Sequence, residues 1–188
     1  MSTILSGYGI ELTLPSSWYG EIFRDVDELH DTGPTVHLAN TPMILGDRNT
    51  YASQTRPIMR PDDAIVCVWN MPSLPNIMAA SGEAAHPTRG WSLWGASDVS
   101  FEGVPDGHSS VRKGVRVGER VFDVVAFFGT EPPPARLMSE IESILATVRI
   151  DVSQRDRGER LEQFFSTAAA ERIQKEMQSE ARARARPA

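Results

Sequence analysis

Residues 8–23 read YGIELTLPSSWYGEIF, and this stretch decides the fold class. Over its first half, apolar and polar residues alternate with the period of a strand that has one buried face. The apolar positions of this run are Ile10, Leu12 and Leu14. Pro15 ends the run because proline cannot donate to a strand ladder. Two serines then predict a turn, and a second extended run begins at Trp18.

The same stretch separates a folded domain from an export signal. A secretory signal needs basic residues ahead of an apolar run. Residues 1–16 contain no Lys or Arg, and Glu11 interrupts the apolar residues. The sequence also has no run that approaches the roughly 18 apolar residues of a membrane span. We therefore expect the first strands of a folded domain in a cytoplasmic protein.

Length and composition favour one domain with an extension. The chain has 188 residues, of which 40% are apolar and 23% charged, as is typical of a globular protein with a buried core. We expect a domain over residues 1–151 and a linker with a helical extension over residues 152–188. Cys67 is the only cysteine, so neither an intramolecular disulfide nor a thiolate-rich zinc site is possible.

The charge is divided unevenly between these two parts. Residues 1–151 hold 19 acidic and 11 basic residues, whereas residues 152–188 hold six acidic and eight basic ones. An acidic body disfavours a nucleic-acid-binding surface, which needs clustered positive charge. The sequence ends in ARARARPA, which we interpret as a frayed terminus. The alternative is that its three arginines contact phosphates or an anionic lipid surface.

Further strands are predicted after residue 30. The segment 63–71, DAIVCVWNM, is the most continuous apolar run up to that point and predicts a central strand. Segments 109–117 and 121–129 flank a turn at Gly118, which predicts a hairpin. Two other segments read as strands, TVHLANTPM at 35–43 and SDVSFEG at 97–103.

Two helices are predicted near the end of the chain. Residues 131–150 begin with prolines compatible with a first helical turn and carry one apolar stripe. The stripe consists of Leu137, Ile141, Ile144, Leu145 and Val148. A second helical pattern covers residues 161–181, after a polar linker. The predicted fold class is α+β, an antiparallel sheet flanked by helices, with a C-terminal helical extension.

The order of these elements over roughly residues 7–150 resembles the PsbP-like fold group, which includes DcrB-type proteins. The residues that carry the likeness are GIELTLPSSW, the strand pair that ends in VFDVVAFFG, and the closing helix PPPARLMSEIESILATVRI. The resemblance implies an adaptor or assembly factor rather than an enzyme, and some cytosolic relatives act as chaperones for apolar segments. The segment 70–97 and the C-terminal helix depart from the family pattern.

Candidate catalytic and metal-binding residues have plainer interpretations. The cluster DELHD at 27–31 contains oxygen and nitrogen ligands, but it lacks the spacing of a calcium loop, so we interpret it as solvated surface. Cys67 lies between valines in the most apolar strand, which favours a buried thiol over a nucleophile. His37 is read as a packed strand residue, and Asp62 with Asp63 as turn acceptors. We expect no metal and no cofactor.

The segment 70–97 holds the first candidate contact residues. It mixes Pro, Gly, Ala and Ser with large apolar residues, and a loop this long is often functional. The candidates are Met71, Met78, Trp91 and Trp94. They either fold back and cap the sheet, as most large apolar residues do, or form a partner-binding patch.

The C-terminal helix holds the second set. Its apolar residues form two neighbouring rows, wide enough for a groove and too irregular for a long coiled coil. The candidate contacts are Phe164, Phe165, Ile173 and Met177. We expect a non-enzymatic adaptor or chaperone-type domain that engages a protein partner or a second copy through this helix and the apolar loop. The alternative is a structural component of a larger phage or contractile-injection-type assembly.

Overall fold

A computed structural model gives the fold of the chain. It describes residues 2–26, 31–44, 46–49, 51–71, 83–84, 87, 89–93, 95–98, 104–118 and 120–153. Within these residues the chain is mostly β, with two sheets and one α-helix.

The smaller sheet has the strand order β1-β2-β10 and is antiparallel throughout. Its strands are β1 (Ser2–Gly7), β2 (Ile10–Pro15) and β10 (Arg149–Ile150). The hairpin between β1 and β2 turns at Tyr8 and Gly9, whose φ angles of 50° and 71° are both positive. A two-residue turn of this hand matches the twist of the strands it joins.

The larger sheet has the order β3-β4-β5-β9-β8-β6, with β7 also paired to β8. Its strands are β3 (Tyr19–Val26), β4 (Asp31–Ala39), β5 (Ala64–Met71), β6 (Glu83–Ala84), β7 (Ser97–Asp98), β8 (Ser109–Val117) and β9 (Arg120–Phe128). All neighbours are antiparallel except β6 and β8. The predicted central strand at 63–71 and the hairpin at Gly118 are both confirmed.

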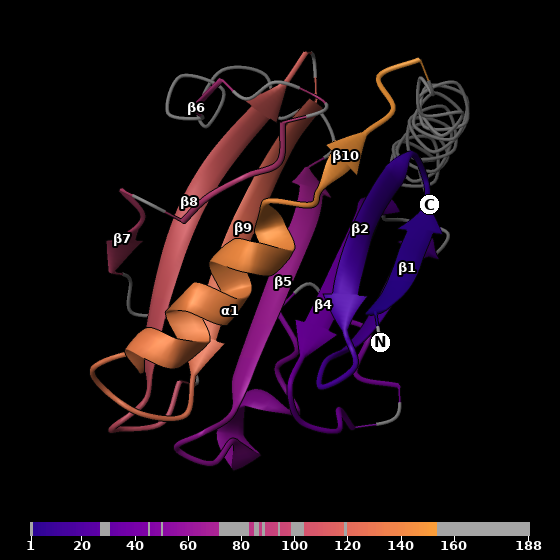
Figure 1. The fold of residues 1–188 in the computed structure, drawn as a ribbon. Helices are drawn as coiled ribbons and strands as arrows, with labels where there is room; N and C mark the ends of the chain where they lie inside the picture. Colours follow the sequence, from indigo (N-terminus) through magenta and orange to yellow (C-terminus); the bar gives the residue numbers. More distant parts are fainter. Residues whose placement is uncertain are drawn as a thin grey trace, which may run out of the picture.

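Helix α1 (Ala135–Leu145) and the smaller sheet lie side by side over the same face of the larger sheet (Figure 1). The predicted stripe of α1 is buried in the core between them. Val148 shares this burial although the helix ends at Leu145, because the chain turns there and continues into β10. The buried strand residues of β2 are Ile10, Leu12 and Leu14, as their alternation predicted.

The opposite face of the larger sheet is covered by the connection between β4 and β5, which contains the short 3₁₀ helix η1 (Arg56–Ile58). Its apolar contacts come from Ala52 and Met59 against Ile65 and Phe127. The predicted antiparallel sheet is thus confirmed, whereas helices on both faces are not observed in the described residues. Prolines and a glycine recur through this connection, and they prevent a long helix there.

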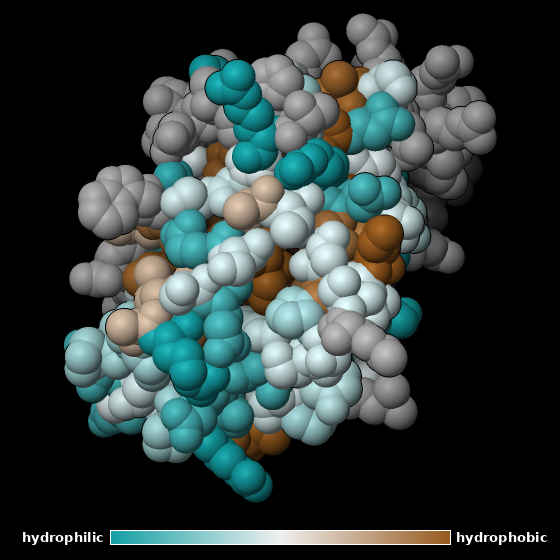
Figure 2. Space-filling model, viewed as in Figure 1, coloured by the Kyte–Doolittle hydropathy of each residue, from teal (hydrophilic) through white to brown (hydrophobic). Residues whose placement is uncertain are grey.

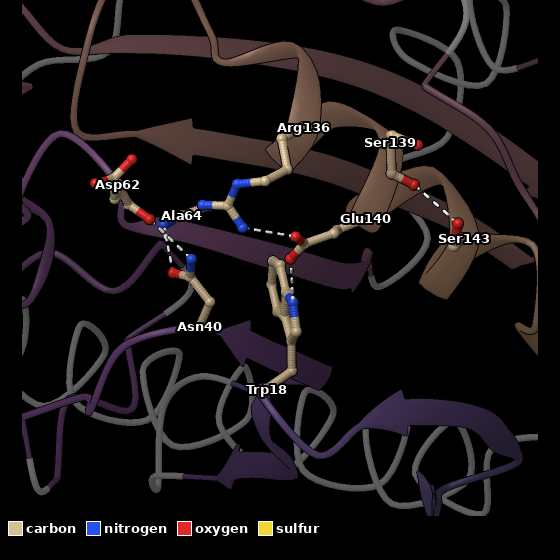
Figure 3. Close-up of polar contacts among 8 residues, drawn as sticks. All are labelled: Trp18, Asn40, Asp62, Ala64, Arg136, Ser139, Glu140 and Ser143. Carbon is tan, nitrogen blue, oxygen red and sulfur yellow. Dashed lines mark hydrogen bonds and ion pairs between the residues drawn. The ribbon is translucent and has the colours of Figure 1, made fainter. Parts of the chain in front are cut away.

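The turn between the two sheets is fixed against α1 (Figure 3). The amide of Trp18 donates to the carbonyl of Pro15 over 3.0 Å, which closes the predicted Pro-x-x-Trp turn. The indole Nε1 of Trp18 donates to Glu140 Oε2 over 3.1 Å, and Arg136 donates to Glu140 Oε1 over 2.6 Å. Burial of the indole together with these bonds sets the position of the β1–β2 hairpin relative to the helix.

A second polar contact in the same view joins the end of β4 to the start of β5 (Figure 3). The side-chain amide of Asn40 donates to the carbonyl of Asp62 over 2.8 Å and accepts from the amide of Ala64 over 2.7 Å. One side chain therefore closes the base of the long β4–β5 connection, which leaves its residues free to cover the sheet.

Candidate protein-interaction surface

Trp91 and Met71, two of the predicted contact residues, are buried inside the domain. Their exposed fractions are 5% and 7%. The ring centroid of Trp91 lies 4.8 Å from that of Phe122, within the core between α1 and the larger sheet. Trp91 therefore folds back onto the sheet, as the first of the two interpretations expected. Contact with a partner would require either residue to leave the core.

The segment around Trp91 is anchored to the end of α1. The amide of Trp91 donates to the carbonyl of Leu145 over 2.8 Å, and the amide of Leu93 donates to Glu142 Oε1 over 2.7 Å. Gly90 allows this approach, because a Cβ atom there would lie 2.0 Å from the carbonyl oxygen of Ala146. The first bond satisfies a carbonyl that α1 itself leaves without a partner.

The remaining predicted contacts lie outside the described residues. They are Met78, Trp94, Phe164, Phe165, Ile173 and Met177. The predicted C-terminal helix and most of the DELHD cluster lie outside them as well. Over the described ranges, no group of three His, Cys, Asp or Glu side chains is placed to hold a metal ion.

The residues considered for catalysis are packed into the structure. Cys67 is 1% exposed, and burial raises the pKa of its thiol well above the ordinary value. His37 is buried with its ring edge-on to Phe23, at 4.8 Å between centroids. Asp63 Oδ2 accepts from the amide of Arg60 over 2.8 Å, which confirms its predicted role as a turn acceptor. His108 contacts the carbonyl of Met59 at 3.2 Å.

The most developed polar cluster lies beneath the β4–β5 connection. Asp123 on β9 is buried, and its two oxygens accept from Arg112 Nε over 2.7 Å and from the Tyr51 hydroxyl over 2.8 Å. Burial, followed by the nearby Asp123 carboxylate, raises the pKa of the Tyr51 phenol. The hydrogen bond to Asp123 raises the pKa of Arg112. Because a carboxylate with both oxygens occupied is a poor base, this cluster attaches the connection to the sheet.

Arg56 lies in the same layer without such a partner. Its guanidinium stacks on Phe127 at 4.7 Å from the ring centroid. Its Nε and Nη1 atoms are buried and have no hydrogen-bond partner among the described residues. Burial lowers the pKa of this guanidinium. The side chain acts chiefly as a cover over the ring.

The clearest unsatisfied feature of the described surface is the outer edge of β1. Thr13 on β2 donates its amide to the hydroxyl of Thr147 over 2.9 Å, and its carbonyl accepts from the same hydroxyl over 3.4 Å. Both groups of Thr13 therefore point away from β1. In an antiparallel pair the residue opposite then points its own groups away too, and Ile4 is opposite Thr13.

By the same alternation, Ser2 and Ser6 also direct their backbone groups outward. Pro15 lies opposite Ser2, a position where its missing N–H costs no hydrogen bond. Among the described strands β1 pairs with β2 alone. We call the outward backbone groups of Ser2, Ile4 and Ser6 the free edge.

The free edge carries none of the features that usually protect an exposed strand. Its sequence STILSG has no charged residue and no proline, and its six-residue register with β2 is continuous. The side chain of Ile4, at the middle of the strand, is 68% exposed. Figure 2 shows apolar atoms reaching the surface over the smaller sheet. An exposed apolar residue on an open strand is typical of a protein-binding edge.

The sequence analysis did not identify β1, because its pattern is short and its turn is unusual. Tyr-Gly is not among the dipeptides that signal a two-residue hairpin. The available signal was the β-branched pair Thr3-Ile4 directly before a glycine-containing turn. The openness of the edge depends on pairing partners, which are set by the whole fold.

Comparisons with known proteins give no relatives for this chain: no family model, no curated protein and no solved structure matches it. Within the described residues, no helix is both long enough and apolar enough to cross a membrane.

Proposed function

We propose that this chain is a non-enzymatic, adaptor-type domain that binds a protein partner by pairing an extended segment with the free edge. The observation that carries the proposal is the outward-facing backbone of Ser2, Ile4 and Ser6 beside the exposed side chain of Ile4. Main-chain hydrogen bonds to an added strand supply affinity, and the alternating side chains supply selectivity.

The packing of the reactive side chains supports a binding role. Cys67 is deeply buried, and Asp123 is held by an arginine and a tyrosine. A catalytic group needs access to a substrate, which these two side chains lack in the described structure.

The PsbP-like assignment is part of the same proposal. It is supported by the closed turn from Pro15 to Trp18, by the β8–β9 hairpin and by the helix that follows it. We further propose that the C-terminal segment provides a second contact through Phe164, Phe165, Ile173 and Met177. The apolar rows of that segment are the basis for this part.

An Ile4→Pro variant tests the proposed edge. Proline removes an outward N–H and places its ring on the open side, without removing a bond of the β1–β2 ladder. Tagged wild-type and variant proteins are purified from the native host, co-purifying proteins are identified, and binding is repeated with the purified partner. We expect the variant to melt like the wild type and to lose the partner.

Ile58→Lys is the matched control, since Ile58 is 63% exposed and lies on η1, away from β1. It should retain the partner. Equal binding by the Ile4→Pro variant would contradict the proposal. Sedimentation of the protein with large particles, independent of Ile4, would instead favour a structural component of an assembly.

A further inference from the structure

We infer that the strand accepted by the free edge is β1 of a second copy, so that two smaller sheets join into one continuous six-stranded sheet. This inference rests on the proposed function, because it names the partner of the same edge. It follows from the symmetry that the edge itself offers.

The free edge is complementary to itself in one register. Antiparallel pairing with Ile4 opposite Ile4 of the second copy places Ser2 opposite Ser6 at both ends. In that register each of these residues exchanges both of its backbone hydrogen bonds with the residue opposite. The two-fold axis passes between the two Ile4 residues, which gives the closed contact that most homodimers use.

The side chains in this register are compatible. Ile4 lies opposite Thr13, whose neighbours Leu12 and Leu14 are buried, so Ile4 is on the outer face of the smaller sheet. Two Ile4 side chains on that face lie next to each other across the junction and exclude water from one another.

Charge does not oppose the junction. β1 has no ionisable side chain, and the nearest acidic residue of the sheet, Glu11, is opposite Ser6. Because Ser6 and Ser2 lie at opposite ends of the symmetric pair, the two Glu11 residues are kept at opposite ends as well. Like charges therefore do not meet across the two-fold axis.

The contact is small, so the dimer is expected to be weak. One six-residue strand per copy buries much less than the roughly 1,200–2,000 Å² of a stable interface. We expect self-association in the range of about 10 µM to 1 mM.

Sedimentation equilibrium over that concentration range tests the inference with four proteins: wild type, Ile4→Lys, Ile4→Glu and Ile58→Lys. Each Ile4 variant places like charges opposite each other, which should weaken the dimer about tenfold or more. An equimolar mixture of the Lys and Glu variants pairs opposite charges and should restore association. Ile58→Lys adds the same charge at a similarly exposed isoleucine and should dimerise like the wild type.

A wild-type protein that stays monomeric up to about 1 mM would overturn the inference. So would an Ile4→Lys protein that dimerises normally, or a mixture that fails to recover. The restored mixture also shows that both variants are folded. If the wild type is monomeric while Ile4→Pro still loses a different partner, the second copy is excluded and the proposed binding edge remains.

Discussion

The hydroxyl oxygen of Thr147 lies 2.9 Å from the amide nitrogen of Thr13, although the two residues are 134 positions apart. β10 begins only at Arg149, so this hydroxyl takes the place of a backbone partner beyond the end of the strand. The contact holds β2 on its inner side. It also fixes which groups of β1 face outward, because the two strands are in register.

Loss of the Thr147 hydroxyl should destabilise the fold. Thr147→Val leaves the Thr13 amide without an acceptor and should lower the free energy of unfolding by about 1–2 kcal/mol. Thr147→Ser keeps the hydroxyl and should cost less. Urea denaturation of both variants measures the difference, and equal losses would show that the hydrogen bond contributes little.

Gly90 should be among the least replaceable glycines. Its φ is +69°, and an added Cβ would lie 2.0 Å from the backbone oxygen of Ala146, so Gly90→Ala should cost about 3 kcal/mol or more. Gly95 has a similar φ of +76° with nothing within 4 Å. Gly95→Ala should therefore show the backbone strain alone, about 1–2 kcal/mol.

A matched pair of arginine substitutions separates a paired cation from an unpaired one. Arg112→Met leaves the buried Asp123 without its cation and should destabilise by about 2–3 kcal/mol. Arg56→Met removes a buried guanidinium that has no hydrogen-bond partner at Nε or Nη1, and should be neutral or stabilise by about 1 kcal/mol. Chemical denaturation at pH 7 checks both signs.

The buried thiol predicts a loss of stability at alkaline pH. Burial raises the pKa of Cys67 in the folded state, so only the unfolded chain releases this proton near pH 8.5. Its contribution is fully present below that pH. Above it, the free energy of unfolding should fall by about 1.4 kcal/mol per pH unit from this group.

Cys67→Val removes the ionisable group while keeping an apolar side chain. Its unfolding free energy should stay nearly level between about pH 8.5 and 10, where the wild type declines. Above about pH 10, Tyr51 should lower the stability of both proteins, because its pKa is also raised by burial. Identical slopes below pH 10 would show that Cys67 ionises in the folded state.

Local patterns predicted the elements whose burial is periodic. Ile10, Leu12 and Leu14 alternate along β2, and the stripe of α1 from Leu137 to Leu145 follows the helical repeat, so both were identified from sequence. The end of the helix was not, because Trp91 and Gly90 come from a distant segment to complete it.

The candidate site depended more strongly on tertiary structure. Trp91 read as a loop residue, and its burial required the partner ring of Phe122 on β9. Ile4 was not singled out, since an exposed isoleucine near a chain end has no local signature. It became a candidate only once the pairing of β1, β2 and β10 showed which backbone groups lack a partner.

Amide hydrogen exchange along β1, measured by NMR at low and high protein concentration, tests the central claim most directly. Thr3 and Leu5 donate within the hairpin and should be protected at both concentrations, as internal controls. The amides of Ile4 and Ser6 should exchange fast in dilute solution and become protected as the protein is concentrated. Rapid exchange of Ile4 and Ser6 at every concentration, or full protection of both even in dilute solution, would contradict the account.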